Sequence, residues 1–165
     1  GQPRTADDIV FTIKTIQNSD YKSPLRANWL GVQVEKKSSE TVTFLLRTPY
    51  SAFLENTTLK IIPKHIWENI PPENFTLSPY NLQPIGSGPF KFKNLKQSDT
   101  GLIKSINLEA NLSYHGPIPY LAEISFIFFD KADDLITAFN KEEVDGFSLN
   151  SLKSYENLKR KDFNL

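Results

Sequence analysis

The chain contains no cysteine and no methionine among its 165 residues. Without cysteine it cannot form a disulfide framework, a thiolate zinc site or a cysteine nucleophile, and it fits a reducing or an oxidising compartment equally well. Without methionine the printed chain has no initiator residue, and it starts at Gly1 directly before a helix signal. We therefore interpret the sequence as a mature or excised segment of a longer protein.

The sequence also lacks an excess charge of one sign and a long hydrophobic run. Nineteen basic residues balance nineteen acidic ones, so there is no net field to hold nucleic acid or an anionic membrane. No apolar run approaches the roughly 20 residues that span a bilayer, and no signal pattern opens the chain. Because 39% of the residues are apolar, we expect a buried core in one compact unit or two small lobes.

No motif for catalysis or metal binding is present. The two histidines, His65 and His115, are fifty positions apart, whereas a metal site needs three or four convergent ligands. There is no Gly-x-Ser-x-Gly elbow, and Gly86-Ser87-Gly88 lacks the lysine and the spacing of a phosphate-binding loop. The sequence therefore predicts no catalytic residue, no metal site and no cofactor, so we expect a protein that is not an enzyme.

Hydrophobic periodicity predicts the elements of the first half. Residues 5–8 (TADD) are typical of a helix start, and apolar residues at helical spacing continue to Ile16. Alternation over 32–46, with a polar turn at 37–40, predicts a β-hairpin. Short helices are expected at 51–56 and 63–68, followed by a proline-containing irregular connection up to residue 85.

The second half alternates again and predicts a sheet with flanking helices. Residues 90–110 predict a second hairpin with its turn at 99–101. Residues 123–129 are apolar on both faces, which is typical of a strand in the middle of a sheet. A helix behind Asp133-Asp134, a short strand at 144–147 and a last helix at 150–160 complete the pattern, which belongs to the α+β (mixed α/β) class.

Several collinear segments together resemble the family 5 extracellular solute-binding proteins, the peptide-binding components of ABC importers. TADDIVFT resembles the TADDVVFT of that family, IPKHIW resembles LPKHIW, and PIGSGPFKF resembles PVGTGPYKF. The chain departs from the pattern at Ala110 and Leu112, which replace an arginine and a proline, and at His115, where an aromatic residue is common. The segments that carry the resemblance are residues 3–13 with 23–24, 41–46 with 49–54, 62–67, 84–92, 108–114 with 119–121, and 139–146.

The resemblance implies a fold and a domain organisation. The fold would be a fragment of a periplasmic-binding-protein-like type II lobe with a small α/β subdomain. Residues 1–85 would form the small extra subdomain of the N-terminal lobe, and residues 86–165 would form part of the main lobe. Family members are several times longer than this chain, so the second lobe would lie outside it.

The resemblance also implies a function and a site. The protein would capture an oligopeptide or dipeptide-like solute, without catalysis, for ABC permease subunits in the membrane. It would be a monomer at the periplasmic or extracellular face of the bacterial membrane, as a secreted protein or a lipoprotein. Ser148 and Asn150 would make polar contacts with the solute, and Trp29 would form a wall of the cleft.

Alternatives remain open for the function and for each of these residues. The fold could serve a structural or regulatory partner-binding domain, since fold does not fix function, and an unrecognised hydrolase is a further alternative. A large aromatic residue such as Trp29 can instead pack in the core. Ser148 could simply end a strand, and Asn150 could cap a helix.

Overall fold

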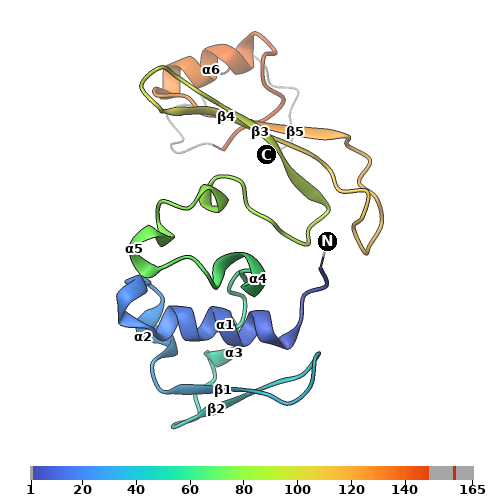
Figure 1. Cartoon of the computed structure of the whole chain (residues 1–165). Helices are drawn as coiled ribbons and strands as arrows, with labels where there is room; N and C mark the ends of the chain where they lie inside the picture. The colour runs from blue at the N-terminus through green and yellow to red at the C-terminus, as the bar shows by residue number, and fades with distance from the viewer. Residues whose placement is uncertain (1, 149–157, 159–165) are drawn as a thin grey trace. The chain divides into compact units, whose positions relative to one another are not determined.

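The computed structural model describes residues 2–148 and residue 158 of the chain. It divides the chain into two compact units, Gly1–Gly86 and Ser87–Leu165, which are described separately below (Figure 1). No described helix is long and apolar enough to cross a membrane. Within the described residues, both units combine helices with antiparallel strands, as the α+β class requires.

The first unit is built on one amphipathic helix and one hairpin. Its regular elements are α1 (Ala6–Gln17), the 3-10 turn η1 (Ser19–Tyr21), α2 (Arg26–Trp29), β1 (Val32–Lys36), β2 (Val42–Leu46), α3 (Phe53–Asn56), α4 (Lys64–Trp67), α5 (Pro72–Phe75) and the 3-10 turn η2 (Pro79–Asn81). In the hairpin, Val32 lies opposite Leu46 and Val34 lies opposite Phe44. The predicted first helix, first hairpin and short helices are therefore confirmed.

The core of the first unit gathers the apolar side chains of these elements. Buried side chains from α1, α2, β1 and α3 form one cluster, and partly buried residues of the hairpin pack against it. Its buried members are Ile13, Ile16, Trp29, Val32 and Phe53. Complete burial of such side chains contributes about 1.5–3 kcal/mol each before entropy costs, so this cluster is the main source of stability in the unit.

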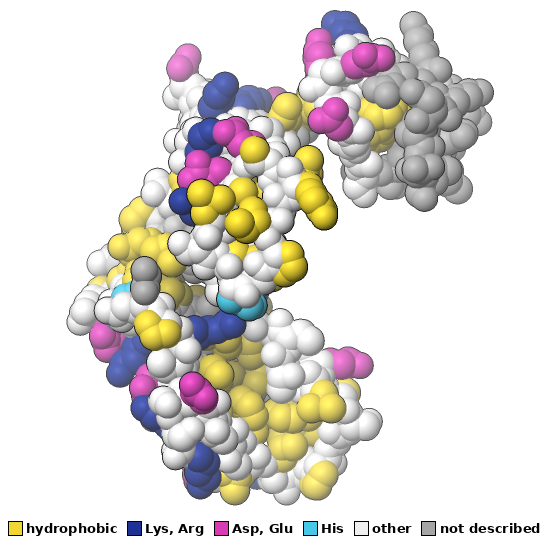
Figure 2. Space-filling model, turned by 90° about the vertical axis from the view of Figure 1, so that its right-hand side faces the viewer, with side chains coloured by type: hydrophobic (Ala, Val, Ile, Leu, Met, Phe, Trp, Pro, Cys, Tyr) yellow, Lys and Arg dark blue, Asp and Glu magenta, His cyan; other side chains and the backbone are white. Residues whose placement is uncertain are grey.

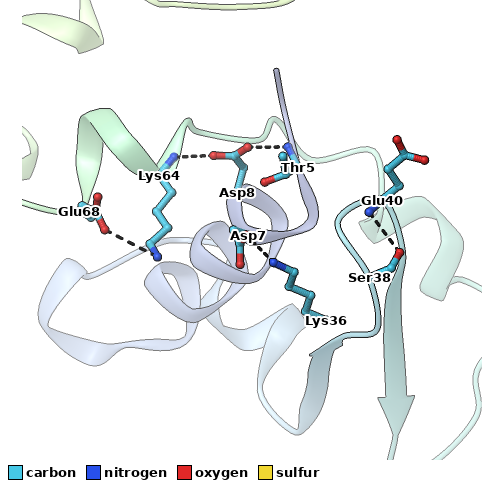
Figure 3. A network of polar contacts seen from close by, with 8 residues as sticks. All are labelled: Thr5, Asp7, Asp8, Lys36, Ser38, Glu40, Lys64 and Glu68. Atoms are coloured by element: carbon cyan, nitrogen blue, oxygen red, sulfur yellow. Dashed lines mark hydrogen bonds and ion pairs between the residues drawn. The ribbon is translucent and has the colours of Figure 1, made fainter. Parts of the chain in front are cut away.

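A buried carboxylate joins the start of α1 to the start of α4 (Figure 3). One Asp8 oxygen accepts the backbone N–H of Thr5 at 2.8 Å, which is half of a capping box, and the other accepts the backbone N–H of Lys64 at 2.7 Å. One turn further along α1, the Thr12 hydroxyl accepts the backbone N–H of Ile62 at 3.1 Å. The segment before α4 is therefore held along α1 by side chains, without a β-ladder.

The connection between residues 69 and 85 contains more local structure than the sequence predicts. It includes α5 and η2, both of which have a proline in their first turn. The Phe75 ring of α5 lies 4.4 Å from the Trp67 ring and 4.8 Å from the Tyr21 ring, measured between centroids. These aromatic contacts, rather than a periodic pattern, order this segment.

The second unit contains an antiparallel sheet and one described helix. Strands β3 (Phe90–Gln97), β4 (Ile103–Ala110) and β5 (Glu123–Ile127) are followed by α6 (Ala132–Asn140), which lies beside the sheet (Figure 1). The sheet order is β3-β4-β5, so β4 is central. Phe90 lies opposite Ala110 and Phe92 opposite Leu108, which confirms the predicted hairpin; a β-bulge follows Phe92.

Two expectations for the second unit are wrong for the described residues. The strand predicted in the middle of the sheet, β5, lies at its edge, and Phe126 remains 51% exposed. The strand predicted at 144–147 is absent, because no described segment forms a ladder with these residues. Both outcomes depend on the neighbouring strands: β5 has one described neighbour, β4, and residues 144–147 have none.

Candidate functional site

A hollow of the second unit lies between β5 and the segment that follows α6. Its volume is about 1010 Å3, and its walls are formed by Leu121 and residues 123–132 and 143–148, together with Leu135 and Ile136. We call this hollow the β5 slot. The wall at 143–148 follows the tight end of α6, where Glu142 adopts a positive φ of 63°. This turn brings the chain back beside the sheet.

Ser148 is an exposed residue at the end of the described wall. It lines the β5 slot next to Phe147, whose ring packs 4.9 Å from the Phe139 ring in a T-shaped arrangement. Ile136, Phe139 and Leu158 form the buried cluster against which Val144 and Phe147 pack. Ser148 thus follows an anchored neighbour and is itself exposed. Asn150, the second predicted polar contact, lies outside the described residues.

Trp29 occupies a different environment from the predicted cleft wall. Its side chain is 1% exposed in the core of the first unit. Its ring lies 5.8 Å from that of Phe44 and 5.9 Å from that of Phe53. A ring with no accessible surface cannot stack on a ligand, so the burial favours the alternative of core packing. The sequence could not separate these roles, because Trp29 follows a polar stretch in a short helix with no clear period.

The surface of α2 near Trp29 borders a second, shallower hollow. Its volume is about 580 Å3, and it is lined from α2, the turn at Gly31 and the hairpin. Arg47 is the only charged residue in this lining, beside the hydroxyl-bearing residues Thr48 and Tyr50. Ala27 and Asn28 of α2 line this hollow, whereas Trp29 does not.

The described ion pairs are solvent-exposed, and Glu123, a partner in one of them, also lines the β5 slot. The Lys36 ammonium group donates a hydrogen bond to Asp7, which lowers the pKa of that carboxyl below its usual value of 3.8. The Glu123 carboxylate accepts a hydrogen bond from Lys93, which raises the pKa of that lysine above its usual value of 10.5. Both groups are solvent-accessible and paired, as expected for surface salt bridges. Neither pair lies in a setting that would poise it for acid–base catalysis.

Hydrophobic side chains reach the surface in both units (Figure 2). In the second unit, Phe126, Ile127 and Phe128 are 51%, 46% and 48% exposed, and all three line the β5 slot. Sequence reasoning did not assign these residues to a site. The sequence did contain a signal for them. A strand with apolar residues on both faces needs packing partners on both faces, and one neighbouring strand does not provide them.

Comparisons with known proteins agree with this architecture. The chain is similar to the oligopeptide-binding protein AppA of Bacillus subtilis, with 33% identity over 153 residues that cover 90% of the chain and 27% of AppA. The structure of AppA in complex with a nonapeptide matches with a TM-score of 0.77, 33% identity and coverage of 87% of this chain and 28% of that one. The structure of the ABC transporter substrate-binding protein CtaP of Listeria monocytogenes matches with a TM-score of 0.75 and 37% identity. The match covers 87% of this chain and 29% of the CtaP chain.

These likenesses place the fold among the type II periplasmic binding proteins. The sequence profile of bacterial extracellular solute-binding proteins, family 5 middle, matches residues 1–164. The chain belongs to this family, which confirms the resemblance seen in its sequence. It spans about 27% of the length of the AppA protein that it matches.

Proposed function

We propose that this chain is part of an extracytoplasmic receptor that captures peptides for an ABC importer and releases them unchanged. The observation that carries the proposal is the match of the family profile to residues 1–164. The similarity to AppA, whose structure contains a nonapeptide, supports a peptide as the solute. The absence of a recognisable nucleophile, base and orienting group in the sequence supports a role in binding without catalysis.

The two units would belong to different parts of the N-terminal lobe of such a receptor. Residues 1–85 would form the small extra subdomain, and residues 86–165 would form part of the main N-terminal lobe. Ser148, which is exposed beside an anchored aromatic residue, would make a polar contact with the peptide, and Asn150 would make a second one. Core packing, rather than contact with the peptide, is the role that we assign to Trp29.

Capture would follow from closure of two lobes on an extended peptide. Backbone and polar side-chain groups of the lobes would bind the peptide main chain, and hinge closure would report occupancy to the membrane permease. The receptor would act as a monomer at the outer face of the cell membrane, as a secreted protein or a lipoprotein; the family's description as extracellular solute-binding proteins supports this location.

A thermal-shift experiment tests the proposal. The full-length protein would be heated with a mixed peptide library; a peptide at 100 times its Kd stabilises the native state by about 2.7 kcal/mol and raises the Tm. The 165-residue chain serves as the control, and we expect little or no shift for it because one side of a cleft leaves the peptide solvated. Cleavage of the peptides, or the absence of any shift in the full-length protein, would contradict the proposal.

A further inference from the structure

The shallower hollow, which lies in the first unit between α2 and the hairpin, has Arg47 as its only charged lining residue. We call it the Arg47 hollow. The arginine side chain lies over the turn between α2 and β1, because its Cδ and Nε atoms are 3.6 Å and 3.7 Å from the position that a Cβ of Gly31 would occupy. The missing side chain at Gly31 therefore gives the arginine a surface to pack on at the hollow.

Arg47 is a cation that has no counter-ion among the described residues. No hydrogen bond or ion pair links it to any of them, and no Asp or Glu lines the hollow. A guanidinium group presents N–H donors in a planar fork that matches a carboxylate. The hollow therefore offers an unsatisfied cationic donor to an anion. By contrast, other cations of the same unit pair with described carboxylates, as at Lys36, Lys37 and Lys64.

Tyr50 adds a second donor to the lining of the hollow. Its phenolic oxygen accepts a hydrogen bond from the Asn56 side chain at 2.7 Å, and its ring packs against the Phe53 ring in a T-shaped arrangement at 5.9 Å. These two contacts orient the phenol. Because the oxygen accepts from Asn56, its own O–H group remains free to donate, and no described residue accepts it. The hydroxyl group of Thr48 lines the same hollow.

The rest of the lining is mainly apolar. It includes the side chains of Ala27, Leu30, Val32 and Leu46, and Leu30 is 53% exposed. The volume of about 580 Å3 falls within the range of small-molecule sites, which combine apolar walls with a few polar groups. An inorganic anion would use only the donors of the hollow. A carboxylate that carries an apolar group would use both the donors and the apolar walls.

We propose that the Arg47 hollow binds a carboxylate that carries a small apolar group. The guanidinium group of Arg47 would pair with the carboxylate, the hydroxyl groups of Thr48 and Tyr50 would donate to its oxygens, and the apolar walls would contact the attached group. Two sources present this chemistry, a free organic acid and the C-terminal residue of a peptide. The inference goes beyond the proposed function, because the hollow lies entirely within residues 27–50 and uses no other part of a receptor.

An NMR titration of the isotope-labelled 165-residue chain tests the proposal. The probe is N-acetyl-leucine, and N-acetyl-leucinamide, which has the same apolar group but no carboxylate, is the neutral control. We expect the acid to shift the backbone amide signals of Gly31, Arg47 and Thr48 with a Kd of roughly 1–10 mM, as suits a ligand of about a dozen atoms. The neutral probe should bind at least about tenfold more weakly. Equal affinities, or no shift at these amides, would overturn the proposal.

Substitutions in the hollow provide a second readout with a matched control. Arg47→Gln keeps a polar side chain but removes the charge, and it should weaken N-acetyl-leucine binding at least about tenfold. Tyr50→Phe removes only the hydroxyl group and should weaken binding about 2- to 10-fold. Lys60→Gln removes an exposed cation that does not line the hollow, so it should leave the affinity unchanged. Wild-type affinity in Arg47→Gln would contradict the proposal, and the Tm of each variant verifies that it is folded.

The full-length protein distinguishes the two sources by ligand-observed NMR. Displacement of N-acetyl-leucine by a peptide with a free C-terminus, but not by its C-terminally amidated form, would assign the hollow to the peptide. Binding that persists in the peptide-saturated protein would assign it to a free acid. If full-length protein bound no N-acetyl-leucine with or without peptide, other residues would cover the hollow and the proposal would be overturned. Peptide capture is scored separately by thermal shift, so the two proposals can fail independently.

Discussion

The Asp8 carboxylate accepts the backbone N–H of Lys64 at 2.7 Å, across 56 positions of the chain. Asp8 is 7% exposed, and its second oxygen accepts the N–H of Thr5. One side chain therefore caps the start of α1 and fixes the start of α4 beside it. The sequence indicated the first role, because acidic residues favour the first turn of a helix. It contained no signal for the second, which depends on where Pro63 brings the chain.

The first prediction concerns this double role. Asp8→Ala should destabilise the chain by about 2–3 kcal/mol, because two partly or fully buried N–H groups lose their acceptor. Asp8→Asn keeps one oxygen acceptor and should lose about 1 kcal/mol. The measurement is urea unfolding of the 165-residue chain. Asp7→Ala is the matched control, since Asp7 is the exposed neighbour and should have only a small effect. Equal effects at both positions would show that Asp8 acts only as a surface charge.

The second prediction concerns pH. The hydrogen bond from Lys36 lowers the pKa of Asp7 in the folded chain. A carboxyl whose pKa is depressed on folding contributes stability above its unfolded pKa, and this contribution disappears as the pH falls through the folded value. The wild-type chain should therefore have a higher urea midpoint than Asp7→Asn near neutral pH, and this difference should shrink and disappear as the pH falls through the lowered pKa of Asp7. If the difference in urea midpoint between the two proteins grew as the pH fell, the ion pair would not stabilise the folded chain in the way proposed here.

The third prediction separates the two roles considered for Trp29. As a core residue, Trp29→Ala should cost about 3–5 kcal/mol of unfolding free energy, because it removes a buried ring that contacts Phe44 and Phe53. Tyr50→Ala is the comparison, since Tyr50 is 44% exposed and should cost clearly less. If Trp29→Ala instead left stability nearly unchanged and weakened peptide binding by the full-length protein, the ring would be a cleft wall after all.

The features that sequence reasoning found are those with local causes. The α1 start, the first hairpin and the turn before β4 all follow from periodicity and turn chemistry within a few residues. The features it missed depend on distant partners. The edge position of β5 and the missing strand at 144–147 depend on which strands are present to pair, and the burial of Trp29 depends on how α3 and the hairpin close over it.

The fourth prediction tests Ser148 as a contact of the solute. In the full-length protein, Ser148→Ala should weaken peptide binding by about 2- to 10-fold, which corresponds to the loss of one hydrogen bond. Its Tm should stay unchanged, because the side chain is exposed in the described structure. Ser113→Ala, in the exposed loop between β4 and β5, is the control and should leave the affinity unchanged. Isothermal titration calorimetry, with a peptide that the wild-type protein binds, measures the affinity of each variant. Equal affinities for Ser148→Ala and Ser113→Ala would show that Ser148 is not part of the site.

The last prediction concerns the turn between α2 and β1. Gly31 has a φ of 82°, and the Gln17 side chain holds this turn by donating to the backbone carbonyls of Trp29 at 2.8 Å and Val32 at 2.7 Å. Gly31→Ala should cost about 1–2 kcal/mol, because a Cβ is unfavourable in the left-handed region. The space is not limiting, since the nearest atom to that Cβ, the Arg47 Cδ, is 3.6 Å away.

Gly86→Ala is the matched control for that substitution. Gly86 lies outside the left-handed region, and a Cβ there meets nothing within 4 Å. The change should therefore be neutral or stabilise the chain by up to about 1 kcal/mol through the unfolded state. Urea unfolding of both variants measures the difference. If Gly31→Ala were as stable as Gly86→Ala, the positive φ at Gly31 would not be a requirement of the turn, and Gln17 alone would determine how the hairpin leaves α2.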